Sequence, residues 1–263
     1  MPPVNVTQAR RVDRPGRARR LAERGIATGT TAWRTPSQRR VLLAVGSALL
    51  AAVAFARVAE DYLTNDPLAR WDVRFAHWLA LERTPAGVDA FRALTFFGSP
   101  AVALVLTAAV FLGLYRRRFL LDAALLPLVL AGAELLNLIL KLAFHRERPE
   151  VAFVHLDTYS FPSGHAMIST AACGALAYLA WPRLRTRGRQ LMLLAATMVL
   201  VSLISFSRLY LGVHYLSDVL AGVAGGLFWL SVSIALHAAY GERFVVRFSG
   251  SRIDRFGRLI LRS

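Results

Sequence analysis

Cysteine, lysine and acidic residues are all scarce in this 263-residue chain. Because Cys173 is the only cysteine, an intrachain disulfide is excluded. Only 18% of the residues are charged, and the 16 acidic residues are outnumbered by 32 basic ones, all of them arginine except Lys141. Hydrophobic residues make up 56% of the chain. This composition is typical of a membrane protein, and it excludes a disordered chain, a collagen and a disulfide-rich scaffold.

Long hydrophobic runs account for most of the chain after residue 40. Each is close to the roughly 20 residues with which a helix crosses a bilayer, where a helix satisfies its own backbone hydrogen bonds. The sequence therefore predicts an all-α bundle of six transmembrane helices. The first run ends in Ala54-Phe55-Ala56, which resembles a signal-peptide cleavage site, but the region before it is too long for a signal peptide. The six runs are 41–56, 93–115, 119–140, 165–181, 190–206 and 219–240.

The charges between these runs predict the orientation of the bundle. Residues 1–40 contain ten arginines and two acidic residues, and the short links 116–118 and 183–189 are also rich in arginine, whereas 57–92 has five arginines against six acidic residues. By the positive-inside rule, the arginine-rich segments and the basic stretch 241–263 lie in the cytoplasm, and so do both termini. The loops that then face outward are 57–92, 141–164 and 207–218.

Three parts of the chain are therefore expected. Residues 1–40 are predicted to be a disordered basic cytoplasmic tail, 41–240 the six-span domain, and 241–263 a basic amphipathic cytoplasmic tail on the anionic inner leaflet. Ile253, Phe256 and Ile260 would form the apolar face of the second tail. Apart from Trp33, the first tail lacks aromatic residues for base stacking, so no nucleic-acid partner is predicted.

The outer loop 57–92 contains one helical stripe of apolar residues. Its members, spaced i, i+4, i+7 and i+8, are Trp71, Phe75, Trp78 and Leu79. Such a stripe suits a helix that lies at the lipid interface, but it suits equally a helix that packs on the bundle. The sequence leaves both alternatives open.

Three polar stretches stand at the outer ends of the predicted helices, where the bundle can bring them together. The first ends the third run, the second opens the fourth, and the third leads from the fifth run into the sixth. They read Lys141-x6-Arg148-Pro149, Pro162-Ser163-Gly164-His165 and Ser207-Arg208-x5-His214-x3-Asp218.

The first property of these stretches is an excess of positive charge. Lys141, Arg148 and Arg208 have no equal set of carboxylates nearby in the sequence. Since unpaired cations next to hydrocarbon are costly, the cluster predicts an anionic partner. Ser163 is expected to cap the fourth helix, so that the amide of Gly164 and the amide after it point outward as donors to an anion. Together these groups predict a phosphate-binding site.

Two histidines flank that site. His214 and Asp218 are one helical turn apart, so the carboxylate can hold one ring nitrogen and leave the other free as a nucleophile. His165 has no carboxylate four residues on, and it is better suited to protonate the leaving oxygen. The pattern is typical of phosphoryl transfer through a phosphohistidine that water then hydrolyses.

In these three stretches the chain resembles the type 2 phosphatidic acid phosphatase superfamily, over roughly residues 94–240. The resemblance implies a helical bundle of the phosphatase/haloperoxidase type, with His214 as nucleophile, Asp218 as its orienting partner and His165 as acid. Six spans disfavour the haloperoxidase branch, whose members are soluble. The residues that would hold the phosphate are Lys141, Arg148, Ser163, Gly164 and Arg208.

The sequence thus predicts a metal-independent phosphatase without a cofactor, because no carboxylate cluster has metal-ligand spacing. It is expected in a bacterial cytoplasmic membrane, with its site on the extracytoplasmic side. The substrate would be a phosphorylated membrane lipid: phosphatidate, phosphatidylglycerophosphate or a polyprenyl diphosphate such as undecaprenyl diphosphate. The alternatives are a lipid phosphotransferase with a polyprenyl diphosphate donor, or an anion transporter. The oligomeric state is not predicted.

Several polar residues outside the signature remain open. Glu134 lies inside a predicted span, where it either packs as a neutral or hydrogen-bonded group or tunes the site. His145 could line the phosphate site. Otherwise it has the structural role that is also expected of the remaining histidines, which are His77, His155 and His237.

Overall fold

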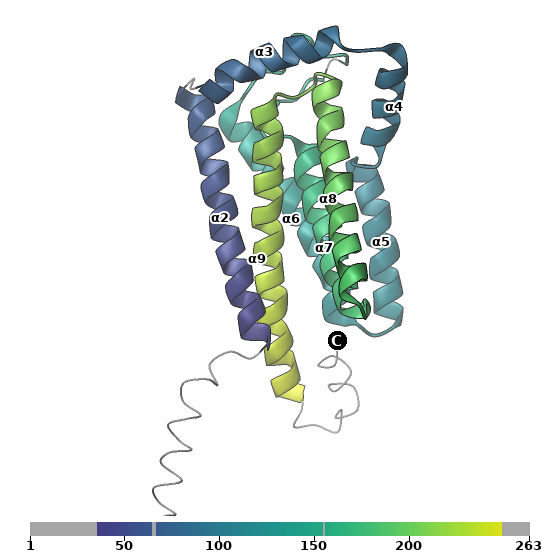
Figure 1. Ribbon diagram of the computed structural model, residues 1–263. Coiled ribbons are helices and arrows are strands. Elements are labelled where there is room, and N and C mark those ends of the chain that lie inside the picture. Colours follow the sequence, from purple (N-terminus) through teal and green to yellow (C-terminus); the bar gives the residue numbers. More distant parts are fainter. Residues whose placement is uncertain (1–35, 65–66, 155, 249–263) are drawn as a thin grey trace, which may run out of the picture.

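The computed structural model describes residues 36–64, 67–154 and 156–248, with side chains as far as residue 241. Within these ranges the chain is helical and contains no strand. Most of the helices run side by side in a bundle, while α3 lies across one end and α4 lies beside it (Figure 1). The elements are α2 (Pro36–Thr64), α3 (Pro67–Leu81), α4 (Pro85–Phe96), α5 (Pro100–Arg116), α6 (Leu120–Phe144), α7 (Gly164–Ala180), η1 (Trp181–Arg183), α8 (Arg187–Tyr210) and α9 (Leu216–Phe248).

Five helical stretches of the described chain are long and apolar enough to cross a membrane. They coincide with five of the six predicted runs, which confirms an all-helical integral membrane protein. The remaining run, 165–181, corresponds to α7, which has 17 residues and is therefore about 25 Å long. Small residues dominate α7, and it packs among α6, α8 and α9. The five stretches are Pro36–Thr64, Pro85–Arg116, Leu120–Phe144, Arg187–Tyr210 and Leu216–Gly241.

The second predicted run is divided in the structure. Instead of one helix over 93–115, α4 ends at Phe96 and α5 begins at Pro100. Proline cannot continue a helix from the residues before it, but it suits the first position of a new one. The Ser99 hydroxyl caps α5 by accepting a hydrogen bond from the Val102 amide at 3.4 Å. The turn between the two helices passes close to α7 and α8, since a Cβ on Gly98 would lie 3.5 Å from His165 Cδ2 and closer still to Ile204 Cγ2.

The outer stretch 57–92 is largely helical, because α2 continues to Thr64 and α3 and α4 follow. The apolar stripe of α3 divides between two environments. Leu79 is buried, and Phe75 packs against the core that contains it. The side chains of Trp71 and Trp78 are more than half exposed on the outer surface of α3. The stripe predicted for the second tail, together with residues 1–35, lies outside the described residues.

Small residues set the spacing of the helices around α9. A Cβ on Gly222 would lie 2.5 Å from the Ser163 carbonyl oxygen, and one on Gly226 would lie 2.5 Å from the Met167 carbonyl oxygen. These contacts bring the backbones of α7 and α9 together, as glycine does in membrane helix pairs. On its other side α9 packs along α2, whose buried residues are all alanine. The first residue of α2 and the end of α9 both lie at the end of the bundle opposite α3 (Figure 1).

Candidate active site

The three polar stretches meet at the end of the bundle that α3 covers. The end of α6, the start of α7 and the link between α8 and α9 supply them. One backbone hydrogen bond joins the second stretch directly to the third, from the Ser163 amide to the Asp218 carbonyl oxygen at 2.9 Å. The close approach of Gly222 to Ser163 holds the same two segments together from the side of α9.

His214 and Asp218 are oriented as the sequence predicts. The His214 Nδ1 lies 3.3 Å from Asp218 Oδ2, and the same oxygen accepts a hydrogen bond from the Tyr215 amide at 2.9 Å. Both side chains are buried. Burial lowers the pKa of His214 well below its usual value, and the positive charges of Arg208, Arg148 and Lys141 lower it further. These effects favour the neutral imidazole, and its Nε2 faces Arg148.

Arg148 is the cation that contacts the imidazole, with its Nη1 3.4 Å from His214 Nε2. Backbone and side-chain oxygens hold this guanidinium on several sides. Its Nη1 donates to the Val213 carbonyl at 2.7 Å, its Nε to the Thr158 carbonyl at 2.7 Å, and its Nη2 to Thr158 Oγ1 at 2.8 Å. The loop between α6 and α7 thus fixes the position of Arg148.

The other two cations are held by single anchors. Lys141 Nζ donates to the Tyr159 carbonyl, and Arg208 Nη1 donates to Thr95 Oγ1 at 2.8 Å. The Nε of Arg208 is buried and makes no hydrogen bond within the described residues. In the described part of the chain, neither of these cations nor Arg148 forms a salt bridge. Arg208 is buried, whereas Lys141 and Arg148 are partly exposed. A positive cluster with an unpaired buried donor, the Nε of Arg208, is a suitable environment for an anion.

Ser163 occupies the N-cap position of α7, but the predicted capping role of its hydroxyl is wrong. Its side chain makes no cap hydrogen bond, and Oγ is buried without a partner in the described residues. The hydroxyl is therefore available to an anion. Gly164 follows it at the first helical position, where a Cβ would lie 3.0 Å from Asn137 Oδ1. The first amides of a helix have no partner within the helix, and such an N-terminus is a favourable position for an anion.

His165 stands on the first turn of α7 and lies in the electrostatic field of His214 and the three cations. A Cβ on Gly98 would lie 3.5 Å from His165 Cδ2, so the turn between α4 and α5 passes beside the imidazole. The absence of a side chain at Gly98 leaves room for this approach.

The sequence did not predict all the residues that shape the site. Asn137 donates from Nδ2 to the Pro162 carbonyl at 3.3 Å and so holds the turn before α7. Only its spacing from Lys141, one helical turn away on α6, could have indicated this. Asp72 and Arg146 form buried ion pairs behind Asp218, and no motif pointed to them.

The structure also places the polar residues whose roles the sequence left undecided. Glu134 is partly buried within α6. His145 is the exposed left-handed C-cap of α6: its amide donates to the Lys141 carbonyl at 3.1 Å, and its ring lies 4.6 Å from the Tyr159 ring. His237 bonds to Asp122 at the opposite end of the bundle, His77 is exposed, and His155 lies outside the described residues. Among the described residues, no three histidine, cysteine or acidic side chains are grouped as metal ligands.

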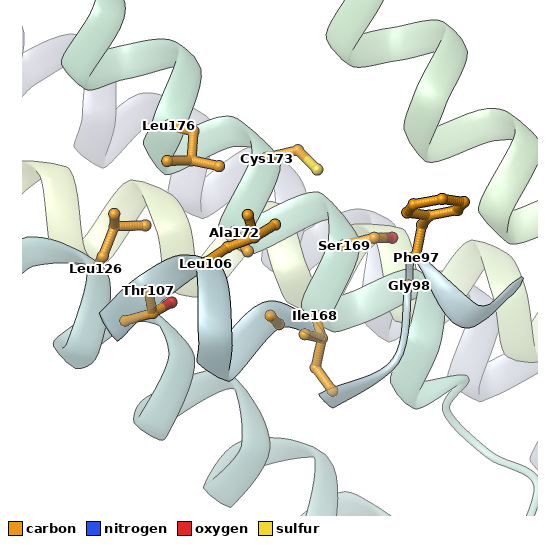
Figure 2. Close-up of a pocket in the computed structure, with 11 residues that line it drawn as sticks. Phe97, Gly98, Leu106, Thr107, Leu126, Ile168, Ser169, Ala172, Cys173 and Leu176 are labelled. Atoms are coloured by element: carbon orange, nitrogen blue, oxygen red, sulfur yellow. The ribbon is translucent and has the colours of Figure 1, made fainter. Parts of the chain in front are cut away.

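An apolar crevice lies between α5, α6 and α7 (Figure 2). Phe97, Gly98 and Ser169 lie toward one end of its lining, and Leu106 and Leu176 lie further along the helices. A Cβ on Gly98 would lie 3.5 Å from His165 Cδ2. The Cys173 thiol is also in its lining, which agrees with the apolar environment expected of a lone cysteine.

Comparisons with known proteins agree with this arrangement. Residues 122–241 match the family model of the PAP2 superfamily. Phosphatidylglycerophosphatase B of Bacillus subtilis (strain 168) is 34% identical over 151 residues, which cover 56% of this chain and 73% of the relative. The chain belongs to the PAP2 superfamily. As a member with phosphatase relatives, it is a phosphoric ester hydrolase.

Two further PAP2 relatives extend the comparison. Decaprenylphosphoryl-5-phosphoribose phosphatase of Mycobacterium tuberculosis (strain ATCC 25618 / H37Rv) is 34% identical over 155 residues, covering 56% of this chain and 78% of the relative. The crystal structure of a transmembrane PAP2 type phosphatidylglycerolphosphate phosphatase from Bacillus subtilis matches with a TM-score of 0.63 and 28% identity. That match covers 73% of this chain and 94% of the other.

Proposed function

We propose that this protein is a lipid phosphate phosphatase that acts through a phosphohistidine at His214. The observation that carries the proposal is the orientation of the buried imidazole. Its Nδ1 faces Asp218, and its Nε2 faces Arg148 and the other cations. A phosphate bound among these cations would have its phosphorus in front of Nε2, which is the arrangement that nucleophilic displacement requires.

In the first step Nε2 of His214 attacks the phosphorus, and the bond from phosphorus to the leaving oxygen breaks. His165 donates a proton to that oxygen, so the product leaves as a neutral alcohol or as a lipid monophosphate. Lys141, Arg148 and Arg208 neutralise the negative charge on the equatorial oxygens, together with the Ser163 hydroxyl and the amides that begin at Gly164.

In the second step a water attacks the phosphorus and the bond to Nε2 breaks. The water loses its proton to His165, which regenerates the acid for the next turnover. The proton on Nδ1 stays between His214 and Asp218 throughout, so the carboxylate compensates the positive charge of the phosphorylated ring. These steps use only groups of this chain and need no metal ion or cofactor.

We further propose that α7 also crosses the membrane and brings the number of spans to six. Six spans return both termini to the cytoplasm and place the catalytic end on the extracytoplasmic side of a bacterial cytoplasmic membrane. The described arginines agree with this orientation. Arg116, Arg117 and Arg118 lie between α5 and α6, and η1 and the start of α8 carry another basic group, all at the end opposite the histidines. Residues 1–40 and 241–263 would then be cytoplasmic tails beside the inner leaflet.

The substrate we propose is a phosphomonoester or diphosphate of a membrane lipid. The apolar crevice between α5, α6 and α7 includes Gly98, where a Cβ would lie 3.5 Å from His165 Cδ2, so a hydrocarbon chain held along this crevice would have its phosphate end near the histidines (Figure 2). Relatives bear the names of a phosphatidylglycerophosphatase, a decaprenylphosphoryl-5-phosphoribose phosphatase and a putative undecaprenyl-diphosphatase. Phosphatidylglycerophosphate, phosphatidate and undecaprenyl diphosphate are therefore the candidates to compare.

The test is phosphate release by the purified protein in detergent from each of these lipids. We expect His214→Ala to abolish release, and EDTA to leave the wild-type rate unchanged. His77→Ala is the matched control, because His77 is exposed on α3 and lies outside the site. Retention of activity by His214→Ala would contradict the nucleophile, and loss of activity in EDTA that returns with Mg²⁺ would contradict the metal-free mechanism.

The phosphotransferase alternative shares the phosphohistidine and differs in the acceptor. Product analysis with undecaprenyl diphosphate, with and without a lipid acceptor, separates the two activities. We expect inorganic phosphate as the product in both mixtures. A phosphorylated acceptor would indicate a transferase, and uptake of phosphate into liposomes without hydrolysis would indicate a transporter.

A further inference from the structure

Behind the catalytic pair lie two further buried charges, Asp72 on α3 and Arg146 in the loop after α6, neither of which is a signature residue of the motifs. With Asp218 on α9, which they contact, they are 0%, 7% and 0% exposed in the order Asp72, Arg146 and Asp218. Asp72 also lies outside the region 122–241 that matches the family model. Burial of three charges is costly unless each is paired, so their arrangement calls for a physical explanation.

Arg146 bridges the two carboxylates. Its Nη1 donates to Asp218 Oδ1 at 2.7 Å, and its Nη2 donates to Asp72 Oδ2 at 2.8 Å. The guanidinium carbon lies 4.5 Å from the centre of the Tyr62 ring and 4.2 Å from that of the Tyr215 ring. Ring contacts and both carboxylates therefore fix the plane of the guanidinium.

Ser217 closes the network, since it precedes Asp218 at the start of α9. Its amide donates to Asp72 Oδ1 at 2.9 Å, and its hydroxyl donates to Asp72 Oδ2. The hydroxyl also accepts a hydrogen bond from Arg146 Nη1 at 2.6 Å. Asp72 thus caps the first turn of α9 from a different helix, and that turn carries Asp218.

The charges of this network determine the electrostatic potential at the His214 imidazole. Asp218 uses Oδ1 for Arg146 and Oδ2 for His214. If Arg146 were paired with Asp218 alone, it would neutralise most of the charge that the carboxylate presents to the imidazole. Because Asp72 shares the guanidinium, the three buried groups carry a net charge of about −1 opposite the ring.

We propose that Asp72 is a positioning residue for catalysis. Through Arg146 and Ser217 it fixes Asp218 and keeps that carboxylate negative toward His214. The carboxylate then stabilises the positive charge that forms on the imidazole when Nε2 bonds to phosphorus. This inference rests on the proposed role of His214, and it gives α3 a part in the reaction although no residue of α3 reaches the phosphate site.

The effect is measurable in the pH profile, because a negative charge near an imidazole raises the pKa of that imidazole. The other charged or titratable groups near His214 come from α6, the loop after it, α7 and α8, and those near Tyr215 include Glu150. All of them stay unchanged in the variants below. They are Lys141, Arg148, Glu150, His165 and Arg208.

Asp72→Asn removes the charge but keeps the shape and an acceptor for the Ser217 amide. We expect kcat to fall about ten- to a hundredfold, the usual effect of removing an outer partner that orients a functional histidine. We expect KM to change little, since Asp72 does not touch substrate, and the acid limb of kcat/KM to move to lower pH. Arg146→Gln removes the opposite charge, so it should move that limb to higher pH.

Opposite movements of the limb cannot arise from a purely structural defect. In the double variant, Asp72→Asn with Arg146→Gln, the charges removed cancel. We expect its limb to return toward the wild-type position while kcat stays low, because the bridge to Asp218 is lost. If one of the single variants does not fold, the double variant still tests the proposal, because it removes both Asp72 and Arg146 charges and leaves neither of them unpaired. A wild-type kcat in the double variant would overturn the proposal.

Asp122→Asn is the matched control. Asp122 also pairs with an arginine and a histidine, Arg183 at 3.3 Å and His237 at 3.1 Å, but at the opposite end of α6. We expect its kcat and acid limb to equal those of the wild type. Wild-type values for Asp72→Asn, or limb shifts in the same direction for Asp72→Asn and Arg146→Gln, would overturn the inference. Failure of the proposed function has a different signature, because His214→Ala would then retain activity.

Discussion

Arg148 Nη1 and His214 Nε2 lie 3.4 Å apart, on the side of the imidazole away from Asp218. A guanidinium can only donate hydrogen bonds, so Nε2 presents a lone pair on this side and the ring proton lies on Nδ1. The contact thus favours the tautomer that a nucleophilic Nε2 requires. It also puts a permanent positive charge next to the proposed nucleophilic atom.

Arg148→Lys should therefore be a severe change, although the charge is kept. Lysine cannot reproduce the planar set of bonds to Thr158 and Val213 and also face the substrate. We expect kcat/KM for the preferred lipid to fall by about a hundredfold or more, measured as phosphate release in detergent. Arg57→Lys is the control, because Arg57 forms only an exposed pair with Glu60 on α2. Equal activity of Arg148→Lys and the wild type would show that the planar guanidinium is not required at this position.

The environment of His214 predicts the acid side of the pH profile. Its pKa is well below the usual 6.5, through burial first and then the charges of Arg208, Arg148 and Lys141. The nucleophile thus stays neutral as the pH falls through 6.5, and the acid limb of kcat/KM should lie below that value. Loss of the proton from the acid gives a second limb, so the profile should be bell-shaped.

Unfolding should show the same shift, with the sign that linkage requires. Between the depressed pKa of folded His214 and the 6.5 of the unfolded chain, the unfolded state binds more protons. The contribution of His214 to stability is complete above pH 6.5 and decreases as the pH falls below it. Thermal unfolding of wild type and His214→Gln in detergent at several pH values measures this contribution. A difference between the two proteins that does not depend on pH would contradict the depressed pKa.

Gly222→Ala should disturb the site from the side of α9. The new Cβ would lie 2.5 Å from the Ser163 carbonyl oxygen, which belongs to the backbone and cannot move without moving the start of α7. We expect a lower unfolding temperature and at least a tenfold loss of kcat, despite the better helix propensity of alanine. Gly225→Ala is the control in the same helix, since its nearest neighbours are side-chain atoms of Met167 at 3.4 Å. Similar behaviour of the two variants would show that the approach of α9 to Ser163 is not required.

The parts of the fold that depend on local pattern could be predicted from the sequence. Five of the helices coincide with hydrophobic runs, because a span in lipid needs a continuous apolar segment. The division of the second run at Pro100 was missed, since hydropathy continues across the turn although the backbone does not. The apolar stripe predicted that α3 is helical. Which members of the stripe are buried depends on tertiary packing, which places Leu79 in the core of the bundle.

The proximity of the three polar stretches was predictable for a similar reason. Each stretch is short and lies at the same end of its predicted helix. Asp72 was not predictable, because its partner Arg146 is 74 residues away and only the position of α3 brings them together. The free hydroxyl of Ser163 also needed the structure, as the sequence alone favours a helix cap at that position.

The backbone contacts between Ser163 and α9 have a consequence for how the substrate preference of this enzyme could change. The contacts that hold the two histidine-bearing segments in register are made by backbone atoms, the Ser163 amide with the Asp218 carbonyl and the Ser163 carbonyl against Gly222. The walls of the crevice, in contrast, consist of side chains of α5, α6 and α7 that take no part in these contacts. On the proposal that a lipid chain lies in this crevice, exchange of Leu106 or Leu176 for residues of another size should change the preferred lipid and leave the hydrolytic step intact.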